Sequence, residues 1–554
     1  MKYIKLFQNR EEFDASAEEI YPSVSYIKGT GAVVFRPIPD REMPMYMEAL
    51  EDLSVSFSKD GMEYSTDMCE WNSLTAGVLT PTVKAGERLY FRATGLTATS
   101  SEGIGTFAMN GRCNIRGNVM SLLCGDSFKD VDIISQNYAF SNLFKNATSI
   151  ISAENLVLNF NTLSSYCYQY MFSDCENLEI APTLLNIGTV GEYGCYGMFY
   201  NCKKLKICPE ISCDKVFPRA FAYMFNNCIS LTETPEQLPY PKTSFVNGGY
   251  YAYMGMFKGC SALTKLPKKL YAGHYMSQDM FAGCTSIEDA SYVEISSANR
   301  NYCFSGLFSG CTSLVNAPEL PATTLGYNCY SSMFKGCTSL VNAPELPATT
   351  LDSCCYSSMF KGCTSLVNAP ELPANTLANG CYDSMFSGCI SLVNAPELPV
   401  TTLANGCYSS MFSGCISLVN APELPATTLA EMCYDSMFSG CTSLVNAPEL
   451  PATTLISSCY SSMFSGCISL VNAPELPATT LKEKCYEDMF YGCTKLSYVK
   501  AMFLTKPGYS YTNGFLLNVA AEGTFVKNSE ATWNVTGHVG IPTGWTVVLE
   551  SPEV

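Results

Sequence analysis

A repeat of 26 residues dominates the second half of the chain and limits what it can fold into. Its unit reads Cys-Tyr-x-x-Met-Phe-x-Gly-Cys-Thr-Ser-Leu-Val-Asn-Ala-Pro-Glu-Leu-Pro-Ala-Thr-Thr-Leu-x-x-x, and it runs from Cys303 to Cys493 without an insertion. Degenerate copies, spaced 24 to 32 residues apart, extend the array back to about residue 140. Because one unit cannot bury its apolar side alone, the units must stack, which predicts a solenoid of about fourteen repeats.

Each unit divides into one part expected to be helical and one expected to be extended. In Cys-Tyr-x-x-Met-Phe-x-Gly-Cys, the cysteines and the methionine share one helical face, and the glycine ends the short helix. The two prolines of Leu-Val-Asn-Ala-Pro-Glu-Leu-Pro exclude a helix and favour extended geometry. One strand and one short helix per repeat is the leucine-rich-repeat pattern, so the predicted fold class is an α/β leucine-rich-repeat solenoid.

The flanks of the array predict small β-rich domains. Alternating residues in 44–130 indicate a small sandwich, with Asp60-Gly61 as the hairpin turn between Ser54–Ser58 and Met62–Ser65. Four units are therefore expected: an N-terminal attachment or capping segment (1–40), a small β-sandwich (41–130), the solenoid (131–499, strictly regular over 303–493) and a β-rich C-terminal cap (500–554).

Composition excludes several classes of function. The formal net charge of -17 argues against a nucleic-acid partner, since binding phosphate needs clustered Lys and Arg. No stretch reaches the ~20 apolar residues of a membrane span, and charges interrupt the N-terminus before a signal peptide could form. Only two histidines are present, His274 and His538, far apart in the sequence, so we expect no catalytic set, no enzyme activity, no cofactor and no metal.

Two columns of cysteine accompany the repeat, eight residues apart within each unit. Structural zinc sites favour closer pairs of ligands, so we expect both columns to point inward as small apolar residues, mostly reduced. Disulfides between neighbouring rungs are the alternative. The first column is Cys303, Cys329, Cys355, Cys381, Cys407, Cys433, Cys459 and Cys485, and the second is Cys311, Cys337, Cys363, Cys389, Cys415, Cys441, Cys467 and Cys493.

Two further columns have both a structural and a functional interpretation. The glutamates are expected to be solvent-exposed, with a calcium-binding ridge as the sharper alternative. The tyrosines are expected in the core beside the phenylalanine of the same segment, and an exposed ladder for stacking on sugar rings is the alternative. The glutamates are Glu319, Glu345, Glu371, Glu397, Glu423, Glu449 and Glu475, and the tyrosines are Tyr330, Tyr356, Tyr382, Tyr408, Tyr434, Tyr460 and Tyr486.

The unit Met-Phe-x-Gly-Cys-Thr-Ser-Leu-x-x-Ala-Pro-Glu-Leu-Pro-Ala-Thr-Thr-Leu resembles the BspA-like leucine-rich-repeat surface proteins, which are abundant in gut Bacteroidales. The opening Lys5-Leu6-Phe7, then Val24-Ser25-Tyr26-Ile27, is similar to the starts of proteins in phages and prophages of these bacteria. The resemblance implies adhesion or recognition through the repeats, without catalysis. The chain departs from the cell-surface members in showing no recognisable export signal or lipoprotein cysteine near its start. We therefore expect a virion or extracellular protein, tail- or fibre-associated, that binds virion proteins through its N-terminal segment. A bacterial cell-surface adhesin and a purely structural spacer are the alternatives.

The three residues between Leu and Cys vary most from one regular repeat to the next, so they must lie on the surface. Asn328 and Ser458 could cap the following helix, but capping does not explain lysine or methionine at the same place. We therefore predict a binding edge for a host or cell-surface glycan or protein. Its candidate residues are Tyr327, Asn328, Asp352, Asn379, Asn405, Glu431, Ser457, Lys482, Glu483 and Lys484.

Overall fold

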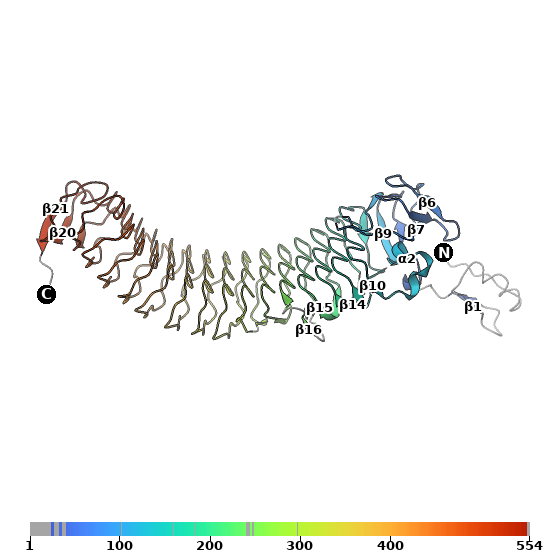
Figure 1. Cartoon of the computed structure of the whole chain (residues 1–554), viewed down its shortest axis with the longest axis horizontal. Coiled ribbons are helices and arrows are strands. Elements are labelled where there is room, and N and C mark those ends of the chain that lie inside the picture. Colours follow the sequence, from blue (N-terminus) through green and yellow to red (C-terminus); the bar gives the residue numbers. More distant parts are fainter. Residues whose placement is uncertain are drawn as a thin grey trace.

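The computed structural model describes residues 40–100, 102–158, 160–182, 184–239, 249–295 and 297–550, with strands β1 (Val24–Tyr26), β2 (Val33–Phe35) and β16 (Ser244–Phe245). The described chain is a long curved stack of rungs, with a β-rich unit at its N-terminal end and strands at the other (Figure 1). No helix within these residues is long and apolar enough to cross a bilayer. The role predicted for 1–40 lies outside the described residues, apart from the antiparallel pair β1–β2.

Two layers of antiparallel strands form the N-terminal unit. Its larger sheet has the order β6–β5–β7–β3–β9, and β4 pairs with β8 separately. Phe91 on β7 packs edge-on against Phe107 on β8, with ring centroids 5.1 Å apart, so the layers share a core. The strands are β3 (Tyr46–Ala49), β4 (Ser54–Phe57), β5 (Met62–Ser65), β6 (Asn72–Leu74), β7 (Arg88–Ala93), β8 (Phe107–Asn110) and β9 (Cys113–Asn118).

The hairpin predicted at Asp60-Gly61 is wrong in its pairing. Gly61 adopts a turn conformation with φ 97°, but β4 pairs with β8, whereas β5 pairs with β6 and β7. The local turn signal therefore marked a reversal of the chain, but the strands on its two sides enter different layers. The Asp60 carboxylate instead accepts a hydrogen bond from the Ala76 N–H at 2.8 Å.

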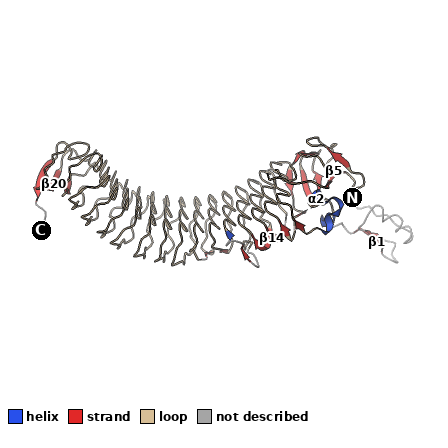
Figure 2. Ribbon diagram, in the orientation of Figure 1, coloured by secondary structure: helices blue, strands red, loops and turns tan. Residues whose placement is uncertain are grey.

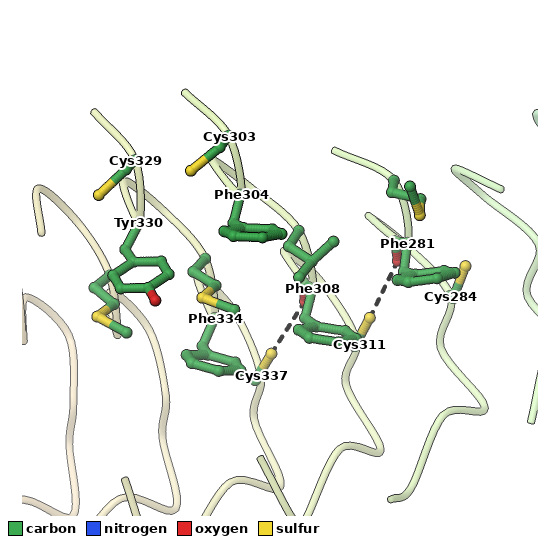
Figure 3. Close-up of a cluster of buried hydrophobic side chains, with 14 of the residues drawn as sticks. Phe281, Cys284, Cys303, Phe304, Phe308, Cys311, Cys329, Tyr330, Phe334 and Cys337 are labelled. Atoms are coloured by element: carbon green, nitrogen blue, oxygen red, sulfur yellow. Dashed lines mark hydrogen bonds between the residues drawn. The ribbon is translucent and has the colours of Figure 1, made fainter. Parts of the chain in front are cut away.

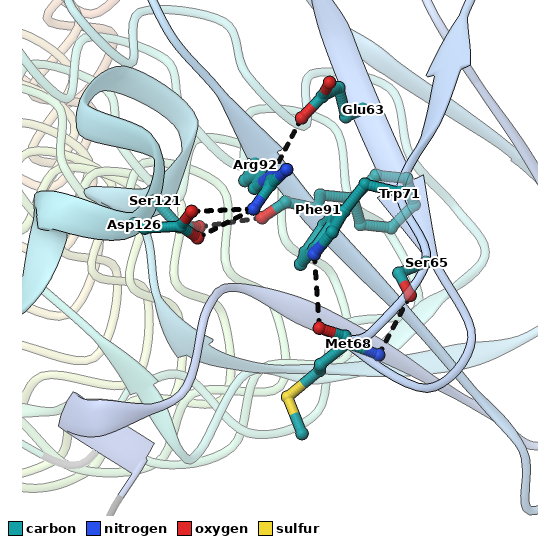
Figure 4. Close-up of polar contacts among 8 residues, drawn as sticks. All are labelled: Glu63, Ser65, Met68, Trp71, Phe91, Arg92, Ser121 and Asp126. Atoms are coloured by element: carbon teal, nitrogen blue, oxygen red, sulfur yellow. Dashed lines mark hydrogen bonds and ion pairs between the residues drawn. The ribbon is translucent and has the colours of Figure 1, made fainter. Parts of the chain in front are cut away.

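A polar cluster ties this unit to the short helices that precede the stack, α2 (Ser121–Cys124) and η2 (Gly125–Asp130). Arg92 on β7 pairs with Glu63 at 2.7 Å and with Asp126 at 2.8 Å, and its guanidinium lies 4.2 Å from the centre of the Trp71 ring (Figure 4). The stack begins directly beyond, because β9 also pairs in parallel with β11 (Ile150–Ser152) and β12 (Leu156–Val157).

Within the stack, the Cys-Tyr-x-x-Met-Phe-x-Gly-Cys part of each rung is a chain of turns. Alternate N–H groups donate to the next rung, as from Tyr330 to the Cys355 carbonyl (3.0 Å) and from Phe334 to the Met359 carbonyl (2.9 Å). The intervening N–H groups donate three residues back, as from Met333 to the Tyr330 carbonyl (3.2 Å). Every fourth residue has positive φ, which in this rung means Asn328 (53°), Ser332 (56°) and Gly336 (73°).

The predicted short helix of each repeat is therefore wrong, and with it the α/β class. An α-helix bonds each N–H four residues back and keeps φ negative, whereas these rungs use half of their N–H groups between repeats. In the described residues the solenoid consists of stacked turns and short parallel strands (Figure 2). The glycine that was expected to end a helix instead occupies a positive-φ position, at 73° to 74° in Gly336, Gly362 and Gly388.

Among the described repeats, continuous strands occur in the irregular first part of the stack and return only beyond the last regular repeat. In the irregular part β10, β13, β14, β15 and β16 form a parallel sheet, and β17 pairs with β18. Regular repeats show isolated bridges instead, such as Asn342 with Asn368 and Thr324 with Thr350. The strands are β10 (Ile133–Ile134), β13 (Thr162–Leu163), β14 (Leu184–Val190), β15 (Glu210–Val216), β17 (Lys269–Leu270) and β18 (Glu294–Ile295).

A column of phenylalanine rings runs through the core of the whole stack. Adjacent rings are stacked with centroids 5.2 to 5.9 Å apart, as for Phe308 and Phe334 (Figure 3). Beside them, each second-column cysteine donates from Sγ to the phenylalanine carbonyl of the preceding rung, 3.2 Å for Cys337 and Phe308. The column is Phe144, Phe172, Phe199, Phe225, Phe257, Phe281, Phe308, Phe334, Phe360, Phe386, Phe412, Phe438, Phe464 and Phe490.

The C-terminal end extends the stack rather than folding back on it. Strands β19 (Tyr498–Ala501), β20 (Thr524–Asn528) and β21 (Thr546–Glu550) pair in parallel. The bridges between the preceding repeats are parallel as well. Large side chains cover the last rungs: Trp533 stacks on Phe503 at 5.1 Å, and Trp545 Nε1 donates to the Ala520 carbonyl at 2.8 Å.

Candidate recognition surface

One column of positive-φ residues follows the same edge of the stack through both the irregular and the regular repeats. We call it the edge column. Each member lies six residues before a phenylalanine of the core column, and all have φ between 53° and 61°. In regular repeats it is the third residue of each variable triplet. Its members are Tyr138, Tyr166, Tyr193, Arg219, Tyr251, Tyr275, Tyr302, Asn328, Cys354, Gly380, Gly406, Met432, Ser458 and Lys484.

Most of the predicted binding residues are exposed on this edge. The exposed members are Tyr327, Asp352, Asn379, Asn405, Glu431, Lys482, Glu483 and Lys484, whereas Asn328 and Ser457 are half-buried. The stacking brings equivalent residues of neighbouring rungs together. The Asn379 side-chain carbonyl accepts from the Asn405 N–H, and that of Asn405 accepts from the Glu431 N–H, both at 3.2 Å.

The helix-capping interpretation of Asn328 and Ser458 is wrong, because no helix follows them. Both residues have positive φ, 53° and 54°, and their N–H groups donate to the carbonyls of Ser353 and Glu483 on the next rung. Asn is among the residue types that adopt this conformation most readily, which accounts for it without a cap. Met432 and Lys484 adopt the same φ, so the backbone tolerates many side chains here.

In the irregular repeats the edge column is a ladder of aromatic rings, which sequence reasoning missed. Ring centroids are 4.4 Å apart for Tyr138 and Tyr166, 4.7 Å for Tyr166 and Tyr193, and 4.5 to 4.6 Å from Tyr251 through Tyr275 to Tyr302. Each ring is half-buried because its neighbours cover its faces. A tyrosine six residues before the core phenylalanine was the available signal, hidden by the variable spacing of these repeats.

Arg219 takes the place of a tyrosine in the middle of this ladder. Its guanidinium carbon lies 5.3 Å from the centre of the Tyr193 ring and 4.3 Å from that of Tyr251. The ladder ends at Tyr302, which meets the exposed Tyr327 edge-on at 5.4 Å. Burial and neighbouring phenols raise the pKa of Tyr166 and Tyr275, and burial followed by the hydrogen bond with Tyr327 raises the pKa of Tyr302 to about 12.

The tyrosine column of the regular repeats is core, as expected, and the alternative of an exposed sugar-stacking ladder there is wrong. Its rings are buried and stacked, with centroids 5.8 Å apart for Tyr356 and Tyr382. The hydroxyls of Tyr330, Tyr382 and Tyr460 have no hydrogen-bond partner among the described residues.

The glutamate column is exposed along its whole length, as expected. Successive rungs enclose shallow recesses here, such as one of about 590 Å³ lined by Pro344, Glu345, Pro370 and Glu371. In the part of the chain that the structure describes, no three His, Cys, Asp or Glu side chains converge as a metal site requires. The calcium-ridge alternative therefore gains no support from the arrangement.

Both cysteine columns are buried, as predicted, and the cysteines are free thiols. Burial raises the pKa of Cys389 and Cys441 to about 12. The histidines lie apart: His274 stacks on Tyr250 at 5.0 Å in the irregular repeats, and His538 hydrogen-bonds to Asn513 near the C-terminal end.

Comparison with known proteins gives one informative match. The model of the BspA type leucine rich repeat region matches in six copies, over residues 161–307, 218–341, 244–367, 305–419 and 407–506. No curated protein matches the chain significantly. A solved structure titled "Crystal structure of TLR13-ssRNA13 complex" aligns at 11% identity with a TM-score of 0.17, over 74% of this chain and 65% of that one.

Proposed function

Because this chain belongs to the BspA-type leucine-rich-repeat family, we propose that it is a non-enzymatic recognition protein that binds a host-surface glycan or protein through its repeat array. The observation that carries the proposal is the edge column. Its backbone conformation and inter-rung hydrogen bonds are constant, while its side chains change from rung to rung. A rigid stack with a variable edge is how repeat proteins present an extended binding surface.

The proposed site in the regular repeats comprises the exposed triplet residues from Tyr327 to Lys484. Their side chains differ in charge and size, yet the phenylalanine and tyrosine columns beneath them are unchanged. Variation at these positions is therefore separable from the core, as a surface that selects a ligand requires. In this proposal the acidic chain, with net charge -17, does not bind nucleic acid, and it uses no cofactor.

The proposed location is a phage particle, tail- or fibre-associated, on the resemblance of the N-terminal segment to phage proteins. Virion proteins would then bind that segment. Two other roles have support of their own: a bacterial cell-surface adhesin, from the family, and a structural spacer, from the unbroken 26-residue register over 303–493. Electron microscopy of purified virions with labelled antibody separates the first location from the second, and a glycan array separates recognition from spacing.

The binding test gives all seven triplets the sequence Ala-Asn-Gly, which is already present at 378–380 and 404–406, so that five triplets change. We expect unchanged circular dichroism and thermal unfolding, because this backbone accommodates the triplet, together with loss of binding to host cells. Binding that survives intact would move recognition away from the five changed triplets. A protein that binds no cell and no arrayed glycan before or after the change would support the spacer.

A further inference from the structure

The arginines of the described chain fall into two groups. Arg41, Arg88, Arg92, Arg112 and Arg116 all form ion pairs with carboxylates. Within the described residues, Arg219 and Arg300 form none, and both belong to the rungs that carry the tyrosine ladder. The guanidinium groups of Arg92 and Arg219 both lie over aromatic rings. Of these two arginines, only Arg92 also pairs with carboxylates, those of Glu63 and Asp126, as Figure 4 shows.

The position of Arg219 leaves its donors available to a ligand. A guanidinium stacked between rings keeps its N–H groups in its own plane, where they match the two oxygens of a carboxylate. Arg219 forms no side-chain hydrogen bond in the described part of the chain, and Glu192 on the neighbouring rung does not pair with it. The two flanking rings fix the orientation of the group, so little side-chain freedom is lost on binding.

The neighbouring tyrosines present edges and hydroxyls rather than ring faces. Stacking at 4.4 to 4.7 Å covers the faces of Tyr166 and Tyr275, and Tyr193 lies between Tyr166 and Arg219, which removes the usual platform for a sugar ring. Tyrosine hydroxyls are donors at neutral pH, and burial and neighbouring phenols raise the pKa of Tyr166 and Tyr275 further. The result is a row of tyrosine hydroxyls, interrupted in its middle by the cationic fork of Arg219.

We propose that the tyrosine ladder from Tyr138 to Tyr302 binds a linear acidic polysaccharide, with Arg219 holding a sugar carboxylate and the tyrosine hydroxyls bonding to the sugar hydroxyls on either side. A ladder of tyrosine rings 4.4 to 4.7 Å apart fits a polymer of identical polar units. A folded protein partner would present no such repetition. This inference deepens the proposed function and rests on it, because it names the ligand class and adds a second site in the irregular repeats.

The test measures binding of the full chain to polygalacturonate and hyaluronate by calorimetry, with fully methyl-esterified polygalacturonate as the matched ligand. Esterification removes the carboxylate charge and leaves the sugar hydroxyls. The matched variant is Arg219→Tyr, since Tyr193 and Tyr251 on the adjacent rungs adopt the same φ, 55° and 57°, and would stack on the new ring. We expect a loss of affinity of about 10- to 100-fold from either the variant or esterification.

Two further variants keep the proposal open to refutation. Tyr166→Phe combined with Tyr275→Phe retains stacking and removes hydroxyls, and should weaken binding several-fold. Lys495→Ala, at a position far from the ladder, should leave the affinity for the polysaccharide unchanged. Binding to neither acidic polymer would overturn the proposal, as would affinity insensitive to Arg219→Tyr or to esterification. Equal affinity for poly-glutamate would overturn the sugar class. If Arg219→Tyr binds host cells normally while the seven-triplet variant does not, the proposed function stands and this inference fails.

Discussion

The irregular repeats before residue 303 and the regular repeats after it share one core but differ on their surface. The phenylalanine column passes from Phe281 to Phe308 with the same stacked geometry, 5.7 Å between centroids, as within either part. The edge column, by contrast, changes from tyrosine and arginine to a mixture of small, polar and charged residues. The comparison shows that the inter-rung hydrogen bonds and the core column define the fold, whereas the edge is free to vary.

A second difference concerns the extended side of each rung. In the irregular part β14 and β15 pair over most of their length, from Leu184 with Glu210 to Val190 with Val216. In the regular part isolated bridges occur instead, on the Asn before each Pro-Glu-Leu-Pro segment, as for Asn342 with Asn368, and on the Thr after it, as for Thr324 with Thr350. Proline has no N–H to donate, so two prolines per rung remove ladder hydrogen bonds that the irregular strands retain. Strand pairing is therefore dispensable here, because the turns on the other side connect the rungs.

The largest expected effect is alkaline loss of the regular repeats. Burial raises the pKa of Cys381, Cys389 and Cys441 to about 12 from an ordinary 9.0. Below about pH 9 both folded and unfolded chains keep these protons, so the stability is fully present. As pH rises towards 12 only the unfolded chain releases them, and each thiol removes up to about 1.4 kcal/mol per pH unit.

The irregular repeats should resist longer, because Ala139, Ala220 and Ala252 replace first-column cysteines there. Pulsed alkylation with mass spectrometry between pH 8 and 11, alongside circular dichroism, locates the opening rungs. Cys381→Ala, which copies the irregular residue, should move the transition to higher pH. If the cysteines of the irregular and the regular repeats are alkylated at the same pH, the two parts do not differ in alkaline stability.

The next largest effect tests whether the core is common to both parts. Phe386→Ala and Phe225→Ala should each lower the free energy of unfolding by about 3–5 kcal/mol, since each leaves a cavity in a stacked column. Hydrogen exchange of the flanking rungs measures the loss locally. Phe→Leu at the same two positions is the control, with a smaller expected loss of stability. A markedly smaller loss of stability for Phe225→Ala would show that the irregular core is packed less tightly than its ring-to-ring distances indicate.

The third prediction concerns the glycines of the regular turns. Gly388 has φ 74°, and an added Cβ would lie 3.7 Å from the Gly362 Cα, an ordinary contact. Gly388→Ala should therefore lower stability by about 1–2 kcal/mol through the backbone alone. Gly388→Asn should cost less, because Asn201 and Asn227 occupy this column at φ 59° and 62° in the irregular repeats. Equal losses in thermal unfolding would contradict that ranking.

Much of this fold follows from the sequence, for identifiable reasons. Strict spacing reveals the period and the inward columns, so the burial of the cysteines and of Tyr382 was predictable. The helix was not, because residues four and eight apart align both on a helix and in a chain of four-residue turns. Glycine at the third turn, Gly336, fits either structure. The tyrosine ladder escaped prediction because its rungs are joined by segments of unequal length, and only stacking makes Tyr193 and Tyr251 neighbours of Arg219.

A smaller effect, of opposite sign in the two parts, concerns buried hydroxyls. The Tyr168 hydroxyl donates to the Leu158 carbonyl at 3.2 Å, whereas the Tyr382 hydroxyl has no partner among the described residues. Tyr168→Phe should lower stability by about 1 kcal/mol, and Tyr382→Phe should be neutral or stabilising by up to about 1 kcal/mol. Urea unfolding of the two variants checks the signs. Destabilisation by Tyr382→Phe would indicate a bound water on that hydroxyl.

The smallest effects are expected at the variable edge, and they bear most directly on function. Asn379→Ala removes the side-chain acceptor of the Asn405 N–H, so it should lower stability by about 0.5 kcal/mol. Glu431→Ala should change it by less, because that exposed side chain forms no hydrogen bond or ion pair in the described residues. If these variants retain their thermal unfolding but lose host-cell binding, the edge serves recognition. Losses of several kcal/mol would instead mean that the triplets hold the rungs together, and their variation would then reflect compensation within the stack rather than selection of a ligand.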